Sequence, residues 1–112
     1  MELIHWNDFK KVDIRIGTII EVNDFPEAIK PAYQIKVDLG KKIGIKQSSA
    51  QIKDLYTKEE LIDKQVLVVV NFFPKKIGSF ISECLITGFY RKDKKVILAN
   101  FNLKIDNGSR LA

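Results

Sequence analysis

Apolar residues recur at every second position along much of this sequence, and that period limits the chain to a fold built mainly from half-buried β-strands. Residues 33–39 show it most clearly, because Tyr, Ile, Val and Leu alternate there with Gln, Lys and Asp. The same alternation runs from residue 13 to residue 23, where Gly17 predicts a bulge or a sharp bend. A turn at residues 40–42 leads into a third strand that begins at residues 43–46. We therefore expect three strands in the first half of the chain.

The period changes between the third strand and residue 65, which predicts short helical turns in this segment. Ser48 and Ser49 are suited to capping one such turn. Thr57 followed by Glu60 fits the capping box of a second turn, since each side chain can bond the backbone N–H of the other residue. We expect a helical link here.

The second half of the chain returns to strand-forming residues. Residues 65–72 form a continuous run typical of a strand covered on both faces, and residues 83–89 and 95–101 predict two more strands joined by a basic turn. A bent first strand and a helical link between strands three and four are typical of the OB-fold. We therefore predict an all-β protein with short helices, a five-stranded, partly open Greek-key barrel. Another small β-barrel or a sandwich is the alternative, because strand patterns alone seldom determine topology.

Length and composition indicate one globular domain over residues 1–112, with 46% hydrophobic and 29% charged residues. The longest apolar run, residues 66–70, is too short to cross a bilayer, and the first residues lack the pattern of a secretory signal. The single cysteine, Cys84, cannot form an intrachain disulfide. We therefore expect a cytoplasmic protein without membrane insertion.

Side chains that support catalysis are scarce in this sequence. The only histidine, His5, has no obvious partner, and one histidine with one cysteine cannot make a tetrahedral zinc site without carboxylates at unusual spacing. The six glycines are isolated, so the chain lacks a phosphate-binding loop. We predict a protein that is not an enzyme and that holds no metal or cofactor.

The segment NFFPKKIGSFISECL, residues 71–85, is too apolar for an ordinary connection between strands. Large apolar side chains left on a surface mark a binding site or an oligomer interface. Aromatic residues interleaved with lysines also suit single-stranded nucleic acid, and a net charge of +5 favours anionic partners. The candidate polypeptide-binding residues are Phe73, Pro74, Ile77, Phe80 and Ile81. The basic candidates are Lys75 and Lys76 in this segment and Arg91 and Lys92 in the later basic turn.

The segments IKQSSAQI and NFFPKKIGSFISE, together with the closing NGSRLA, resemble the CsaA family of protein-secretion chaperones. That family is in turn similar to the tRNA-binding domain appended to some methionyl-tRNA synthetases. The resemblance covers nearly the whole chain. It implies an OB-fold homodimer that presents apolar pockets with basic rims to unfolded or pre-export polypeptide, and it makes tRNA binding the alternative function.

The resemblance also places the tRNA-binding pattern of Asn, Pro, Lys, Gly and Ser on this chain. It implies RNA or anion contacts for Asn71 and Ser82 beside the four basic candidates, and it includes Pro74 and Gly78. The chain departs from the tRNA binders after residue 82, where Glu-Cys-Leu replaces their usual x-Gly-Met. It departs from CsaA proteins at Phe73 and Asp106, where a proline is usual.

Overall fold

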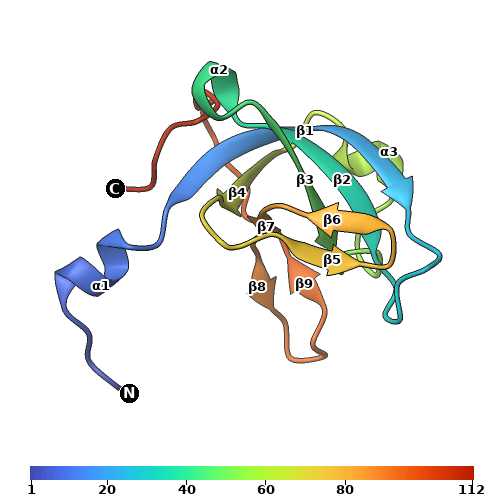
Figure 1. Ribbon diagram of the computed structural model, residues 1–112, viewed down its shortest axis with the longest axis horizontal. Coiled ribbons are helices and arrows are strands. Elements are labelled where there is room, and N and C mark those ends of the chain that lie inside the picture. Colours follow the sequence, from blue (N-terminus) through green and yellow to red (C-terminus); the bar gives the residue numbers. More distant parts are fainter.

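The computed structural model describes residues 1–112, and its centre is a five-stranded antiparallel sheet in the order β3-β2-β1-β4-β7 (Figure 1). The sheet curls into a nearly closed barrel with one seam, where β3 and β7 form its two edges. The predicted OB-type barrel is confirmed. Its strands are β1 (Ile14–Asp24), β2 (Tyr33–Asp38), β3 (Ile45–Ala50), β4 (Gln65–Val69) and β7 (Leu85–Ile86).

The strand β1 contains a bulge, but not at the glycine where the sequence predicts it. Ile19 pairs with Val37 and Glu21 with Lys36, so Ile20 is the extra residue and its side chain turns outward. Gly17 serves a different purpose, because a Cβ atom there would lie 2.3 Å from the Cγ1 atom of Val37. The glycine therefore lets β1 and β2 pack closely across the inside of the barrel.

Ser48 and Ser49 lie within β3 and cap no helix, so that prediction is wrong. They pair with Ile35 and Gln34 of β2, and this backbone pairing outweighs the tendency of serine to cap. The chain instead forms α2 (Gly40–Ile43) before β3 and α3 (Lys58–Leu61) before β4. At α3 the predicted capping box is confirmed, because Thr57 Oγ1 accepts from Glu60 N at 3.2 Å and Glu60 Oε1 accepts from Thr57 N at 2.9 Å.

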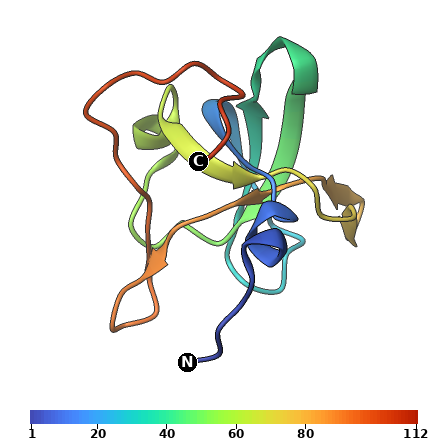
Figure 2. The ribbon, with the colours of Figure 1, turned by 90° about the vertical axis from the view of Figure 1, so that its left-hand side faces the viewer.

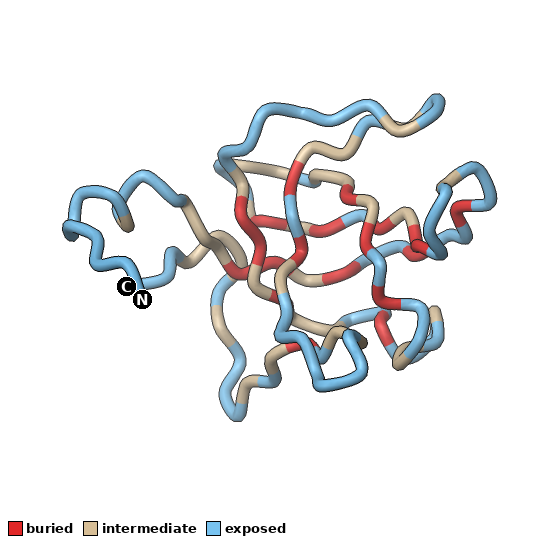
Figure 3. The backbone as a smooth tube through the Cα atoms, turned by 90° about the horizontal axis from the view of Figure 1, so that it is seen from below, coloured by how far each residue is buried: buried red, intermediate tan, exposed pale blue.

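The core fills the barrel, and α3 is the helix that contributes a buried side chain to it. Its fully buried side chains come from every long strand and from α3: Ile19, Ile35, Val37, Leu39, Leu61, Val66, Val68 and Ser48. Figure 3 shows the buried positions following the crossing strands, while the loops and both ends of the chain are exposed. Leu61 anchors α3 to the core, which explains the period change in that segment.

The strands predicted over residues 83–89 and 95–101 are much shorter in the structure, since only Leu85–Ile86, Phe89 and Val96–Ile97 of these ranges lie in strands. Two hairpins leave the barrel after residue 72. The first pairs β5 (Lys75–Ile77) with β6 (Phe80–Ser82), and the second pairs β8 (Phe89–Tyr90) with β9 (Val96–Ile97). Residue 98 already leaves the strand pattern, because its N–H bonds the Tyr56 hydroxyl at 2.9 Å. Figure 2 shows the β8–β9 hairpin projecting from the barrel and the last segment arching away before it returns.

The end of α1 and the closing segment of the chain lie side by side at β1, where Arg110 Nη2 donates to Lys10 O at 2.8 Å. The helix α1 (Trp6–Lys10) has no buried residue, and the closing segment bonds β1 through Ser109 O and Gly108 N, both paired with Ile16. The Asp13 carboxylate accepts from Arg15 Nε at 2.6 Å and lies 3.5 Å from Arg110 Nε. The hydrogen bond from Arg15 lowers the pKa of Asp13. None of the helices is long and apolar enough to cross a membrane.

Candidate binding surface

The β5–β6 hairpin lies against the barrel through one aromatic contact. Its strands are joined by a two-residue turn at Gly78, whose φ of 60° is easily adopted by glycine. Phe80, just after the turn, packs on the buried Phe25 with ring centroids 5.2 Å apart. The predicted residues Ile77 and Phe80 are cross-strand partners and share one face of the hairpin. The structure therefore makes Phe80 an anchor of the hairpin.

Other predicted polypeptide-binding residues are open to solvent. Phe73 is 97% exposed and Ile81 is 47% exposed, and neighbouring Phe72 is 57% exposed. Pro74 is exposed as well. The β4–β5 loop and the outer face of the hairpin thus present an apolar surface, which we call the apolar loop surface: Phe72, Phe73, Pro74 and Ile81.

The lysines of β5 border this surface and lack ion-pair partners. Lys76 pairs with Ile81 across the hairpin, whereas Lys75 pairs with Ser82, so the two ammonium groups point to opposite faces. Some lysines elsewhere are neutralised, as at Lys58, which lies 3.0 Å from Asp24. The apolar loop surface therefore has a rim of uncompensated positive charge.

Asn71 and Ser82, the two polar candidates, are already engaged inside the chain. Asn71 Oδ1 accepts from Asp13 N at 3.0 Å, and its Nδ2 donates to Lys11 O at 2.6 Å. Ser82 Oγ accepts from Ser49 N at 3.1 Å. Asn71 fastens the β4–β5 loop to the segment before β1, and Ser82 helps to close the barrel.

The seam of the barrel is closed by the residues just after the hairpin. Glu83 N donates to Gln47 O at 2.8 Å, and Glu83 Oε1 accepts from Gln47 N at 3.1 Å. Gln47 Nε2 also donates to Ile81 O at 2.8 Å. Side-chain oxygens thus replace part of a strand ladder, and the hairpin is held to β3 by the same bonds.

The predicted residues Arg91 and Lys92 lie on the β8–β9 turn, apart from the first hairpin. Arg91 is paired with Asp93 by two bonds, Nη2 to Oδ2 at 2.6 Å and Nε to Oδ1 at 3.1 Å. The bond from Arg91 lowers the pKa of Asp93 to about 2. Lys92 is exposed and has no ion pair. The structure does not unite the six predicted RNA-contact residues into one site.

Cys84 and His5 are the side chains that the sequence offers for nucleophilic catalysis. Cys84 is buried beside the seam, and burial raises the pKa of its thiol to about 12. A thiol with that pKa is a poor nucleophile at neutral pH. His5 is the N-cap residue of α1, and its backbone N–H donates to Asp8 Oδ2.

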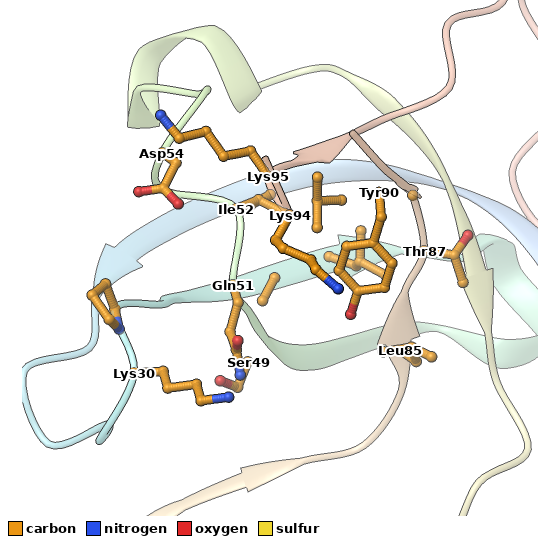
Figure 4. A pocket seen from close by; sticks show the side chains of 15 residues that line it. Lys30, Ser49, Gln51, Ile52, Asp54, Leu85, Thr87, Tyr90, Lys94 and Lys95 are labelled. Carbon is orange, nitrogen blue, oxygen red and sulfur yellow. The ribbon is translucent and has the colours of Figure 1, made fainter. Parts of the chain in front are cut away.

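One cavity was missed by the sequence interpretation. It has a volume of about 580 Å³ and lies between the end of β3, β7 and the β8–β9 hairpin (Figure 4). Its walls come from four separate stretches of chain, around residues 30, 49–54, 85–90 and 94–96. A pattern read along the sequence cannot reveal such a site, because folding alone brings these stretches together. We call it the seam pocket.

Comparison with known proteins agrees with this architecture. The family model described as "Putative tRNA binding domain" matches residues 14–110, which include every strand of the barrel. The chain belongs to the tRNA-binding domain family. Methionine–tRNA ligase of Pyrococcus horikoshii is 47% identical over 77 residues, which are 69% of this chain and 10% of that enzyme. The chain thus spans about a tenth of the length of the curated relatives it matches.

Two solved structures cover the chain almost completely. The CsaA chaperone protein of Picrophilus torridus is 50% identical, with a TM-score of 0.92 over 98% of this chain and 100% of that one. The CsaA chaperone of Bacillus anthracis is 39% identical, with a TM-score of 0.91 over 99% and 100%. The resemblance to CsaA proteins stated from the sequence is confirmed.

Proposed function

We propose that this protein is a chaperone that binds unfolded or pre-export polypeptide, with the apolar loop surface as its main contact. The observation that carries the proposal is the exposure of Phe73 in the β4–β5 loop and of Ile81 on the hairpin that Phe80 fastens to the barrel. A rigidly held apolar surface loses little entropy when an extended chain settles on it. The unpaired Lys75 and Lys76 would attract acidic segments and speed encounter. The likeness to two CsaA chaperones supports this role.

The test is binding of a reduced, unfolded, fluorescently labelled protein to the full chain. The double variant Phe73→Ala and Ile81→Ala should weaken binding about fivefold or more, since loss of a central apolar anchor costs 1–3 kcal/mol. Phe89→Ala is the matched control, because this side chain is also exposed, at 67%, but lies on β8. Equal affinity in the wild type and the double variant would contradict the proposal.

We also propose that the chain forms a homodimer through its N-terminal arm, residues 1–10. Leu3, Ile4 and Trp6 are 66–83% exposed, and no residue of α1 is buried. Such apolar side chains usually pack against a partner. Light scattering at micromolar concentration should give twice the 12.9 kDa of one chain, whereas a mass of 12.9 kDa would contradict the dimer.

Binding of tRNA is the second candidate function, favoured by the family match and by the unpaired lysines of β5. The two functions respond differently to salt. An interaction that rests on about six phosphate contacts should weaken roughly 10³-fold between 50 and 200 mM salt. Apolar polypeptide binding should hold steady over that range. Titrating a tRNA and an unfolded protein at both salt concentrations separates the two.

We infer a binding role in the cytoplasm, without catalysis. The matching family model describes only a binding domain, and about nine-tenths of the length of the related enzymes lies outside the region that matches this chain. The buried thiol of Cys84 supports this inference. Replacing His5 with alanine should leave both ligand affinities unchanged.

A further inference from the structure

The seam pocket combines an apolar floor with polar walls. Ile52 and Val96 belong to the floor, while Ser49 and Gln51 border it from the end of β3. The Ser49 hydroxyl and the Gln51 amide make no hydrogen bond within the chain. Figure 4 shows both beside the pocket, with Tyr90 on the opposite strand. The volume of about 580 Å³ is within the range of sites that hold small ligands.

The charge around the seam pocket is positive and uncompensated. Lys30, Lys94 and Lys95 border it, and none of them has an ion-pair partner. Asp54 is the only carboxylate in its wall. A few residues away, by contrast, Lys53 and Lys58 are both paired with Asp24. The pocket therefore suits an anionic ligand.

Tyr90 gives the pocket a flat aromatic wall. Its side chain is 80% exposed although it projects from a strand, and its hydroxyl makes no hydrogen bond. An exposed ring beside free lysines is the arrangement on which nucleic-acid bases stack while phosphates pair with the cations. The free polar groups of Ser49 and Gln51 can bond the edge of such a base.

We propose that the seam pocket binds one base of single-stranded RNA, with Tyr90 stacked on the base and Lys30 and Lys94 on the adjoining phosphates. The three cations against one carboxylate favour RNA over a polypeptide of ordinary composition. The pocket lies apart from the apolar loop surface, so this proposal does not rest on the chaperone function. It predicts a stacking contact that the lysines of β5 cannot supply.

The experiment measures fluorescence anisotropy of a labelled six-nucleotide single-stranded RNA with the full chain at 50 mM salt. Tyr90→Ala should weaken binding about fivefold or more, because one stacked base contributes at least that much. Tyr90→Phe keeps the ring and should stay within about twofold of the wild type. An abasic strand with the same phosphates should bind the wild type and Tyr90→Ala equally. Each variant is checked by circular dichroism, and Tyr90 is exposed enough for both to fold.

A second variant tests the cations. Lys94→Gln should lower the dependence of affinity on salt by about 0.7 in log–log slope, the contribution of one phosphate contact in single strands. Lys75→Gln with Lys76→Gln should leave the effect of Tyr90→Ala intact. Three outcomes would overturn the proposal. Tyr90→Phe could bind RNA as weakly as Tyr90→Ala, or the wild type could bind abasic RNA as tightly as intact RNA. Tyr90→Ala could also weaken the binding of an unfolded polypeptide and leave RNA binding unchanged.

Discussion

The two hairpins that leave the barrel contain similar residues but differ in how their charges and aromatic rings are used. In β5–β6, Phe80 is packed against the barrel and both lysines are free. In β8–β9 the Tyr90 ring is open to solvent, and Arg91 is paired within the turn although the lysines beside it are free. The number of basic residues in a hairpin therefore does not indicate how much positive charge is available to a ligand. That charge depends on which basic residues lack an ion-pair partner.

The difference also appears in how the hairpins are attached. The first is fixed to β3 through Gln47, which bonds both Ile81 and Glu83. The second is fixed mainly at its end, where Leu98 N bonds the Tyr56 hydroxyl. A firmly attached hairpin keeps exposed apolar side chains from folding back onto the barrel, whereas a hairpin fixed at its base can form one wall of a pocket.

The largest expected effect breaks the attachment of the first hairpin. Phe80→Ala removes a half-buried ring from Phe25 and should lower the free energy of unfolding by about 2 kcal/mol, less than the 3–5 kcal/mol of a fully buried phenylalanine. The midpoint of thermal unfolding should fall by roughly 8 °C. Phe73→Ala is the control and should leave the midpoint unchanged, because Phe73 is 97% exposed. Equal midpoints for the two variants would show that Phe80 anchors nothing.

A smaller loss of stability should follow from opening the seam. Glu83→Ala leaves the Gln47 N–H without its acceptor at 3.1 Å, which should cost about 1 kcal/mol in chemical unfolding. Glu83→Gln retains an oxygen at that position and should recover most of the loss. If Glu83→Ala instead raised RNA affinity without changing stability, the carboxylate would act on the ligand and not on the seam.

The barrel could be predicted from the sequence because its signals are local. The alternation in β2 and the capping box at Thr57 each depend on residues a few positions apart. The bulge was misplaced because Gly17 is required by the approach of Val37, a contact between strands that no local pattern contains. The prediction that Ser48 caps a helix was wrong for the same reason, since its partner Ile35 lies on the neighbouring strand.

The candidate site was predictable only in part. The apolar excess of residues 71–85 correctly indicated exposed side chains such as Phe73. The roles of Asn71 and Ser82 inside the fold were hidden, because their partners lie 58 and 33 residues away in the chain. The seam pocket was hidden for the same physical reason. Polar side chains can serve the fold or a ligand, and only their contacts distinguish the two uses.

The free lysines of the first hairpin give the next prediction. Replacing Lys75 and Lys76 together with Gln should lower the salt slope of tRNA affinity by about two units if both contact phosphate. Binding of an unfolded, uncharged polypeptide should change little, because the apolar loop surface stays intact. Replacing Lys53 and Lys58, which are paired with Asp24, is the matched control and should change the slope less. A slope that is unaffected by the first pair would remove the hairpin from the RNA path.

The smallest expected effect comes from freeing the one paired cation of the second hairpin, Arg91. Asp93→Asn removes the carboxylate that pairs with Arg91 at 2.6 Å and leaves the guanidinium free. RNA affinity at 50 mM salt should rise about two- to threefold, and the salt slope should increase by up to one contact. Polypeptide binding should not change. Unchanged RNA affinity would mean that Arg91 lies outside the RNA path even when its charge is free.

The pH dependence of the same pair provides an independent check on Asp93. The bond from Arg91 lowers the pKa of this carboxyl from 3.8 to about 2, so the ion pair's contribution to stability is fully present above about pH 4. That contribution is lost as the pH falls through about 2, where the folded protein also takes up the proton. RNA affinity measured between pH 5 and pH 8 should therefore show no step from Asp93, and the gain from Asp93→Asn should be constant across that range. A gain that disappeared at pH 5 would mean that Asp93 is already protonated there and that Arg91 does not hold it ionised.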